Sequence, residues 1–383
     1  MSRCRPNLPD LILAAMILLY IVHFSALSIQ ALRAQIPEKA DLGQIDLAIW
    51  NTSRGRFVQE VKGDEISTRL TDHVEPIFWP VSLIFWLWDD VRALLVLQAA
   101  ATAIGALPIH WLAREVLGKG LEPLSSPFNP PSFPPLGERR GMGEGERLEY
   151  TSLLPWAALA FPLAYLLFPA LQAANLADFH AIPLAAAPIA FAFWFAERRD
   201  WPKFLLAAGI LLLVKEDAAL LAFLLGAWAA LRYRAWRVGL LVATASLAWF
   251  VLATFVIVPH YAHADYGEGQ SVYIQRYSEL GSGPGEILRT LLTHPAAVWA
   301  ILTERARLVY IGGLFASAAL LPILAPEVLL LCAPLLAANA LSNYWLQYSG
   351  ELHYSAPLVP YFVIAAIFGA ARLIHRAREK AEV

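Results

Sequence analysis

Three consecutive charged residues, Lys215, Glu216 and Asp217, interrupt an otherwise apolar stretch of the chain. Insertion scales assign roughly 2.5–3.5 kcal/mol to such a charge at the centre of a membrane helix, so these side chains must contact water, one another or an anionic ligand. A lysine at a membrane surface is well suited to a lipid phosphate. The triplet is therefore a candidate binding site, and a plain loop between two helices is the alternative.

Two shorter groups pair a carboxylate with a histidine. Asp72 and His73 closely precede Pro76 and an apolar run, and Asp178 and His180 lie between two apolar runs. A histidine beside a carboxylate can bind a phosphate, a metal ion or a proton. Turn formation by Asp178 and an interfacial position for His73 are the structural alternatives.

Two further carboxylates, Asp41 and Asp46, belong to a segment with a helical apolar pattern. The apolar positions are Leu42, Ile45 and Ile49. Their i, i+3, i+7 spacing predicts a helix that lies on the membrane surface. Asp41 stands at a capping-box distance from Gln44, so it is either the N-cap or a functional carboxylate. Asp46 lies about 140° further around the helix, so the two acids are not expected to act as an adjacent pair.

The last candidates combine histidines and acids later in the chain. They are His260, His263 and Asp265 in VPHYAHADYG, and Glu351 and His353 in QYSGELHYSAP. The first group resembles a metal-ligand cluster only weakly, because its Pro- and Gly-bounded stretch does not predict a stable helix. A solvated loop is the expectation there. The sequence contains no P-loop, dinucleotide fingerprint, zinc-protease helix or nucleophile elbow.

The composition shows which kind of protein carries these residues. The chain of 383 residues is 58% hydrophobic and 16% charged, with a mean hydropathy of +0.53. Ordinary soluble domains are roughly 45–50% apolar and 25% charged, so this chain must place much of its apolar surface in lipid. A net charge of −2 gives no reason to expect nucleic acid as a partner. Cys4 and Cys332 suggest neither a disulfide framework nor a metal cluster.

Apolar runs long enough to cross a bilayer recur along the chain. A hydrocarbon core of roughly 30 Å needs about 20 apolar residues of helix. The convincing runs are 11–32, 91–112, 150–171, 181–196, 238–258, 308–325, 328–341 and 357–373. The shorter runs, which dip into the membrane or cross it only partly, are 76–88, 204–214 and 218–231. Strands are not expected, because no run alternates apolar and polar residues as a membrane barrel does. The sequence predicts an all-α polytopic transmembrane bundle of about 9–11 membrane segments, in one domain over residues 1–383.

Basic residues in short loops predict the orientation of this bundle. They form clusters at Arg3/Arg5, Arg198/Arg199/Lys203, Arg232/Arg234/Arg237 and Arg372/Arg376/Arg378/Lys380. The positive-inside rule places all of these clusters, and the N-terminus, in the cytoplasm. This assignment requires that run 76–88 be re-entrant or interfacial. If that run crosses the membrane fully, everything downstream inverts.

With this orientation, the loops divide into two groups. The long segments 33–75 and 259–307 are extracytoplasmic, and so are the turn at Asp178 and the charged triplet. Residues 118–149, rich in Pro and Gly and without periodicity, predict a disordered cytoplasmic insertion. The polar residues of interest are thus expected on one side of the membrane.

Several sequence blocks resemble those of a known family. The blocks are DLGQIDLAIWNTSRGRF, TDHVEPIF, NLADFHAIPLA, LLVKEDAAL and HYSAPLVPYF. In this order they resemble the prokaryotic polytopic membrane proteins catalogued as domain of unknown function 2079, over nearly the whole chain except 118–149. Leu47 and Thr71 depart from the pattern, which has Gln and Gly at these positions. The resemblance implies a multi-pass protein of a prokaryotic cytoplasmic membrane.

That family in turn resembles a distant branch of the GT-C glycosyltransferases, multi-span enzymes that use polyprenyl-phosphate sugars outside the cytoplasmic membrane. By order along the chain, Asp41 corresponds to the Asp that opens the surface helix after the first span. His73 corresponds to the basic residue before a proline at the next membrane entry. Asp178 corresponds to the second Asp, and Lys215 to a Lys that ends a short helix further on.

The GT-C resemblance implies inverting transfer of a sugar from a polyprenyl-phosphate donor, with that donor and membrane lipid as partners. Asp41 would be the general base, Lys215 and His73 would offset charge on the departing phosphate, and Asp178 would position the acceptor or a divalent metal ion. Further substrate-binding candidates are His180, Glu216 and Asp217, with Asp46, Asp72 and His353 as secondary candidates. A transporter or lipid flippase and a non-catalytic membrane scaffold are the alternatives. The sequence shows no inverted repeat of the kind typical of transporters.

Overall fold

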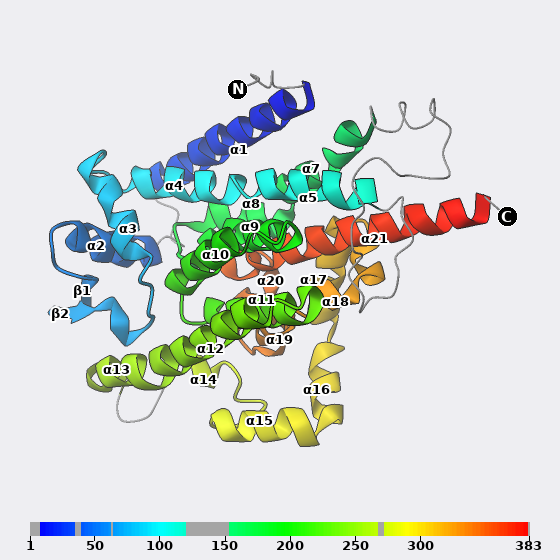
Figure 1. Ribbon diagram of the computed structural model, residues 1–383. Helices are drawn as coiled ribbons and strands as arrows, with labels where there is room; N and C mark the ends of the chain where they lie inside the picture. The colour runs from blue at the N-terminus through cyan, green and yellow to red at the C-terminus, as the bar shows by residue number, and fades with distance from the viewer. Residues whose placement is uncertain (1–7, 35–39, 63, 120–152, 267–271, 382–383) are drawn as a thin grey trace.

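The computed structural model describes residues 8–34, 40–62, 64–119, 153–266 and 272–381. Within these ranges the chain is almost entirely helical, and long helices run in similar directions across the molecule (Figure 1). The predicted insertion 118–149 lies outside the described residues, apart from its first two, which end a helix. The all-α polytopic fold is confirmed.

Four helical segments are long and apolar enough to cross a membrane. They are Leu8–Arg33, Arg92–Gly118, Trp236–Ala262 and Leu358–Ala377. The first is α1 (Leu8–Arg33), and the second contains α4 (Arg92–Ala103) and α5 (Ala106–Lys119). The third contains α12 (Trp236–Leu252), η5 (Ala253–Ile257) and α13 (Val258–Tyr266), and the fourth belongs to α21 (Leu358–Ala381). A fifth span is possible by length if the pair Leu153–Leu166 and Pro169–Ala177, bent by 42°, is counted as one. This pair contains α7 (Ala160–Leu166) and α8 (Pro169–Ala177). Its bend falls at Phe168, since a residue before proline disfavours the helical conformation.

Three shorter apolar helices pack among these spans. They are Ile182–Glu197 (η4, Ile182–Ala185, and α9, Ala186–Glu197), Trp201–Val214 (α10) and Ala218–Tyr233 (α11). Helices α11 and α12 approach closely where two glycines face each other. A Cβ on Gly239 would lie 2.5 Å from the carbonyl oxygen of Gly226. Small residues allow such close helix pairing in membranes.

The segment after α1 forms a cap at one end of the bundle, on the left in Figure 1. It contains α2 (Ala40–Ser53), β1 (Gln59–Lys62), β2 (Glu65–Thr68), η2 (Arg69–Thr71), α3 (Phe78–Ser82) and η3 (Leu83–Trp86). The predicted stripe Leu42, Ile45 and Ile49 forms one face of α2, but it is buried at 2%, 0% and 0% exposure, so this face packs on the protein core and not against a membrane surface as expected. The expectation of no strands was wrong here. The strands β1 and β2 pair antiparallel over four residues each, too short a run for an alternating pattern to stand out.

Run 76–88 does not form a spanning helix. Helix α3 has five residues and η3 has four, and both lie far below the length that a bilayer requires. Trp79, Trp86 and Leu87 are 64%, 67% and 90% exposed, as expected of side chains at a lipid interface. The backbone N–H of Ile77 donates to the carbonyl of Leu213 at 2.7 Å, which joins this segment to the end of α10.

The C-terminal third differs from the expectation of two continuous spans at 308–325 and 328–341. It consists of α14 (Val272–Gln275), α15 (Pro284–Thr293), α16 (Pro295–Leu302), α17 (Arg305–Ser317), η6 (Leu321–Leu324), α18 (Pro326–Leu329), α19 (Ala333–Leu341), α20 (Leu346–Ser349) and η7 (His353–Ser355). Ala319 and Leu320 have positive φ angles of 54° and 60°, which end α17. Segment VPHYAHADYG also differs from expectation, because its first part is helical as α13. The mean hydropathy of a run does not indicate where its backbone forms or leaves a helix.

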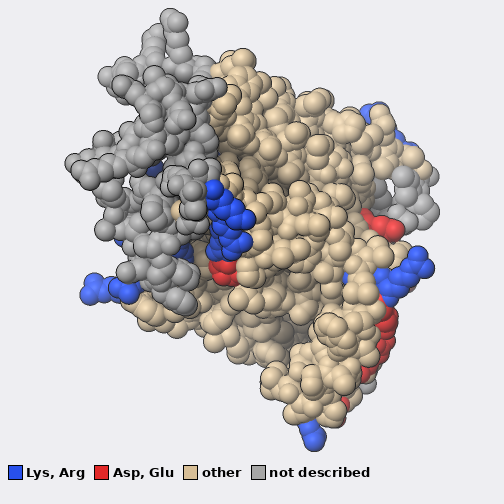
Figure 2. All heavy atoms as spheres, turned by 90° about the vertical axis from the view of Figure 1, so that its right-hand side faces the viewer, with Lys and Arg blue, Asp and Glu red and all other residues tan. Residues whose placement is uncertain are grey.

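Ion pairs join three helix ends at the other end of the bundle. Arg114 Nη1 lies 3.5 Å from Asp10 Oδ1, and Arg198 Nη1 lies 3.3 Å from Glu115 Oε2. These contacts bring the start of α1, the end of α5 and the end of α9 together. Figure 2 faces this end and shows basic side chains scattered among mostly uncharged surface atoms. The cap that contains α2 lies at the opposite end (Figure 1).

Candidate functional site

A buried cluster of Asp178, His180 and His353 lies at the end of α8. Asp178 has an extended backbone, with φ −169° and ψ −172°, and extended chain places side chains two residues apart on one side. His180 Nδ1 accordingly lies 2.5 Å from Asp178 Oδ1. The His353 ring, from η7, stacks on the His180 ring with centroids 3.5 Å apart and planes at 21°. Each of the three residues presents a donor atom within 4.8 Å of the others, the arrangement that can hold a metal ion.

Gln98, on α4, fixes the loop that carries this cluster. Its Nε2 donates to the carbonyl oxygens of Ala174 at 2.9 Å and Asp178 at 2.8 Å. Its Oε1 accepts from the backbone N–H of His180 at 2.8 Å. The side chain is 1% exposed. Sequence reasoning missed this residue, although a lone glutamine inside an apolar run is a signal of an interhelical hydrogen bond.

Asn175, three residues before Asp178, has a structural role. Its Nδ2 donates to the Tyr20 hydroxyl at 3.0 Å and to the Thr102 hydroxyl at 3.2 Å. Its carbonyl accepts from the Ser28 hydroxyl. These bonds tie α8 to α1 and α4, and they satisfy polar groups that would be costly if left unpaired in an apolar interior.

Asp41 lies at the exposed edge of the buried cluster. Its Oδ2 is 3.7 Å from His180 Nε2, and its side chain is 67% exposed. The His180 contact holds the pKa of Asp41 below its ordinary value. Burial acts to lower the pKa of His180, but the neighbouring carboxylates of Asp178 and Asp41 outweigh it and raise that pKa. Asp41 is thus ionised at neutral pH and faces solvent.

A second cluster joins the loop before α3 to the turn between α10 and α11. His73 Nδ1 lies 2.7 Å from Glu216 Oε1, and Glu216 Oε2 accepts from the backbone N–H of Val74 at 2.9 Å. Lys215 Nζ lies 3.6 Å from Asp217 Oδ2. Burial and the Lys215 charge lower the pKa of His73 well below its ordinary value. Lys215, rather than His73, is therefore the cation of this cluster at neutral pH.

Ion pairs adjacent to the second cluster hold the loop before α3 in place. Arg69 Nε contacts Glu75 Oε2 at 3.2 Å, and Lys62 Nζ contacts Asp72 Oδ2 at 2.9 Å. Glu60 is fully buried beside them, and burial raises its pKa. Asp72 thus belongs to the support of the loop. Arg69, another residue that sequence reasoning missed, is 7% exposed and anchors this group.

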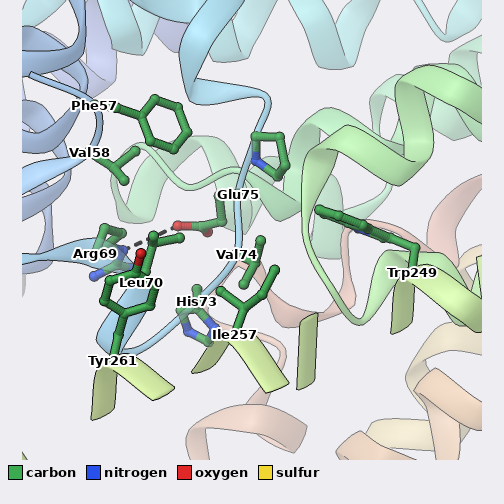
Figure 3. Close-up of a pocket in the computed structure, with 11 residues that line it drawn as sticks. Phe57, Val58, Arg69, Leu70, His73, Val74, Glu75, Trp249, Ile257 and Tyr261 are labelled. Carbon is green, nitrogen blue, oxygen red and sulfur yellow. Dashed lines mark hydrogen bonds and ion pairs between the residues drawn. The ribbon is translucent and has the colours of Figure 1, made fainter. Parts of the chain in front are cut away.

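A cavity of about 290 Å³ adjoins His73 (Figure 3). Its lining residues are Phe57, Val58, Arg69, Leu70, His73, Val74, Glu75, Pro76, Trp249, Ile257 and Tyr261. Asp41, Asp178 and Lys215, which the GT-C resemblance assigns to one reaction together with His73, do not line it. The two clusters nonetheless lie within electrostatic range. Lys215, in the second cluster, contributes to the lowered pKa of His353, in the first, after burial and His180.

The remaining candidates lie apart from these clusters. Burial and the charges of Asp90 and Asp89 raise the pKa of Asp46 to about 6. Asp46 therefore interacts electrostatically with the segment after η3. Its angular separation from Asp41 predicted only that the two acids would not form an adjacent pair. His260 stands on α13, and the side chains of His263 and Asp265 are outside the described residues.

Comparison with known proteins identifies the family. Residues 39–382 match the family model described as "Predicted membrane protein (DUF2079)". No curated protein and no solved structure matches the chain. The match covers most of the chain, including all the residues of both clusters. The spans and shorter apolar helices agree with this description. The chain is therefore a multi-pass membrane protein and belongs to the DUF2079 family.

Proposed function

We propose that this protein is a GT-C-like membrane glycosyltransferase that takes a sugar from a polyprenyl-phosphate donor at the extracytoplasmic face. The observation that carries the proposal is the position of Asp41. This ionised and exposed carboxylate lies 3.7 Å from buried His180, whose stacking partner His353 is within electrostatic range of Lys215. A carboxylate near a cation, at the end of a membrane bundle, fits a reaction between a hydroxyl group and a lipid phosphate ester.

The reaction would be a single displacement. The acceptor oxygen forms a bond to the anomeric carbon as the bond from that carbon to the phosphate oxygen breaks, and the polyprenyl phosphate leaves. Asp41 accepts the hydroxyl proton as the new bond forms. Its lowered pKa makes it a weak base, so it acts once the hydroxyl becomes acidic in the transition state. Lys215 offsets the charge on the phosphate. His73, neutral at this pH, contributes hydrogen bonding instead of charge.

The cavity in Figure 3 suits the lipid end of such a donor. Trp249 and Ile257 bring apolar surface from the long segment that contains α12, and Phe57 brings it from the cap. The indole Nε1 of Trp249 is buried without a hydrogen-bond partner among the described residues, so its N–H is free to donate a hydrogen bond to a polar headgroup of the lipid. Arg69 is already paired with Glu75, so we assign it to support of the site.

The orientation follows from the positive-inside rule applied to this fold. The end that carries the basic clusters would face the cytoplasm, with the N-terminus, and the cap would face outward from the cytoplasmic membrane. In a background without native cysteines, Glu65→Cys in the hairpin should react with a membrane-impermeant maleimide in intact cells. Lys203→Cys, 61% exposed at the other end, should react only after permeabilisation. The reverse pattern would invert the topology and refute an extracytoplasmic site.

The activity test is transfer of labelled sugar from a polyprenyl-phosphate donor in membranes. Asp41→Asn should lower the rate by about 10²–10⁴-fold, the usual contribution of a general base. Asp200→Asn is the matched control, because Asp200 caps α10 at the opposite end and pairs with Lys203 at 2.6 Å. Transfer at the wild-type rate by Asp41→Asn would remove Asp41 from this role. Absence of transfer in every variant, with lipid movement across proteoliposomes, would favour the flippase alternative.

A further inference from the structure

We propose that Asp178, His180 and His353 form a binding site for one transition-metal ion of the Zn²⁺ class. Two imidazoles and one carboxylate make a donor set that zinc accepts, and three protein ligands leave one coordination position open. Nitrogen donors disfavour Mg²⁺ and Ca²⁺, which take oxygen ligands. The three residues come from two loops that the fold brings together at the end of α8.

The spacing of the donor atoms fits a single ion. They lie within 4.8 Å of one another. Zinc–ligand distances of roughly 2.0–2.2 Å put tetrahedral donors roughly 3.4 Å apart. Side-chain rotations would adjust these separations to the tetrahedral value, and they would move His180 Nδ1 and Asp178 Oδ1, now 2.5 Å apart, away from each other.

The second observation is that the His353 imidazole contains a nitrogen that needs a partner. Nδ1 of His353 is buried and makes no hydrogen bond within the described part of the chain. His180 and His353 are 9% and 6% exposed. His180 Nδ1 lies 2.5 Å from Asp178 Oδ1, so one carboxylate and one imidazole already stand together beside this nitrogen. An unpaired buried nitrogen is costly and calls for a ligand, and a metal ion between the three side chains would satisfy it.

The surroundings provide the outer support that metal ligands usually have. Gln98 holds the backbone at Asp178 and at His180. Asp41 Oδ2 lies 3.7 Å from His180 Nε2, the ring nitrogen that would remain when Nδ1 binds the ion. A carboxylate behind a metal-bound histidine fixes the ring orientation and increases ligand basicity. The site is adjacent to Asp41 but does not depend on the transferase proposal, because its test measures metal and needs no sugar donor.

The test uses the full chain in detergent, stripped with chelator and reloaded with Zn²⁺ or Co²⁺. We expect about one ion per chain, and with Co²⁺ the visible absorption of a four-coordinate site. His353→Ala should weaken binding at least tenfold. His110→Gln is the matched control, since His110 is fully buried on α5, near the end that carries the basic clusters, and its Nε2 lies 3.9 Å from Asp10 Oδ1. It should bind metal as the wild type does.

A second variant separates loss of a ligand from loss of fold. His353→Cys keeps a zinc ligand, so the cobalt-loaded variant should gain a thiolate-to-metal absorption band in the near ultraviolet. A folded His353→Cys protein that binds Co²⁺ without this band would overturn the assignment. Substoichiometric binding by the wild type, or unchanged affinity in His353→Ala, would also overturn it.

Discussion

Replacement of Gln98 should destabilise the bundle and displace the residues of the buried cluster. Gln98→Met keeps most of the side-chain volume but removes three hydrogen bonds, of 2.8–2.9 Å, to backbone groups near the end of α8. A hydrogen bond in a membrane protein contributes about 0.6 kcal/mol on average, and a buried group left unpaired costs about 1–3 kcal/mol. Three bonds at that average give about 2 kcal/mol and three unpaired groups at the low end of the range give about 3 kcal/mol, so we expect a loss of about 2–3 kcal/mol in the free energy of unfolding.

The assay is reversible unfolding in mixed micelles, followed by tryptophan fluorescence or by steric trapping. Gln172→Met is the matched control. Among the described residues, the Gln172 side chain makes one longer bond, of 3.3 Å to the carbonyl of Leu166, and its loss should cost less than about 1 kcal/mol. In the same preparations, Gln98→Met should weaken Co²⁺ binding about 10–100-fold, the usual effect of losing an outer support. A stability for Gln98→Met within about 0.5 kcal/mol of the wild type would refute this account of Gln98.

Two further predictions concern packing and pH. Gly239→Ala places a Cβ 2.5 Å from a backbone oxygen of α11. This substitution should lower the free energy of unfolding by about 1–3 kcal/mol in the same assay. Gly312 has open space around it, so Gly312→Ala should be tolerated or should stabilise α17. Equal losses of stability in the two variants would contradict the packing argument. The folded pKa of Asp46, about 6, exceeds its ordinary value of 3.8 because of burial and the charges of Asp90 and Asp89. The folded state thus binds this proton more tightly, so stability should fall by about 1–2 kcal/mol as the pH rises from 4 to 7, allowing for partial exposure. Asp46→Asn should flatten that part of the stability–pH curve, and an unchanged curve would count against the shift.

Apolar periodicity predicted the elements that depend on burial. The stripe of Leu42, Ile45 and Ile49 is in the core, and run 76–88 is too short and too exposed to cross a membrane. The helix break at Leu320 could not be predicted, because mean hydropathy does not report a positive φ angle. The hairpin of β1 and β2 was missed because its strands are short.

The types of residue in the candidate site could be predicted from the sequence, but the contacts between them could not. Carboxylate and histidine residues near membrane ends identified Asp178, His180 and His73 from the sequence. The stacking of His180 on His353, which lies 173 positions later, depends on how η7 packs beside the end of α8. Gln98 and Arg69 were missed for a related reason: each is significant only through the backbone or carboxylate that tertiary structure places beside it.

The location of both clusters at helix ends has a physical cause. Helices α8 and α10 each end at a residue with extended backbone, Asp178 and Lys215, and the backbone groups freed there must find partners inside the protein. At the end of α8 the partner is Gln98, which bonds the backbone on either side of Phe179. At the end of α10 the carbonyl of Leu213 accepts from the cap, and Glu216 binds the cap backbone at Val74. Irregular backbone near lipid is stable only with such bridges, so the bridges that permit these loops also fix the polar side chains that the loops carry. We therefore expect stability and site geometry to change together when a bridge is removed.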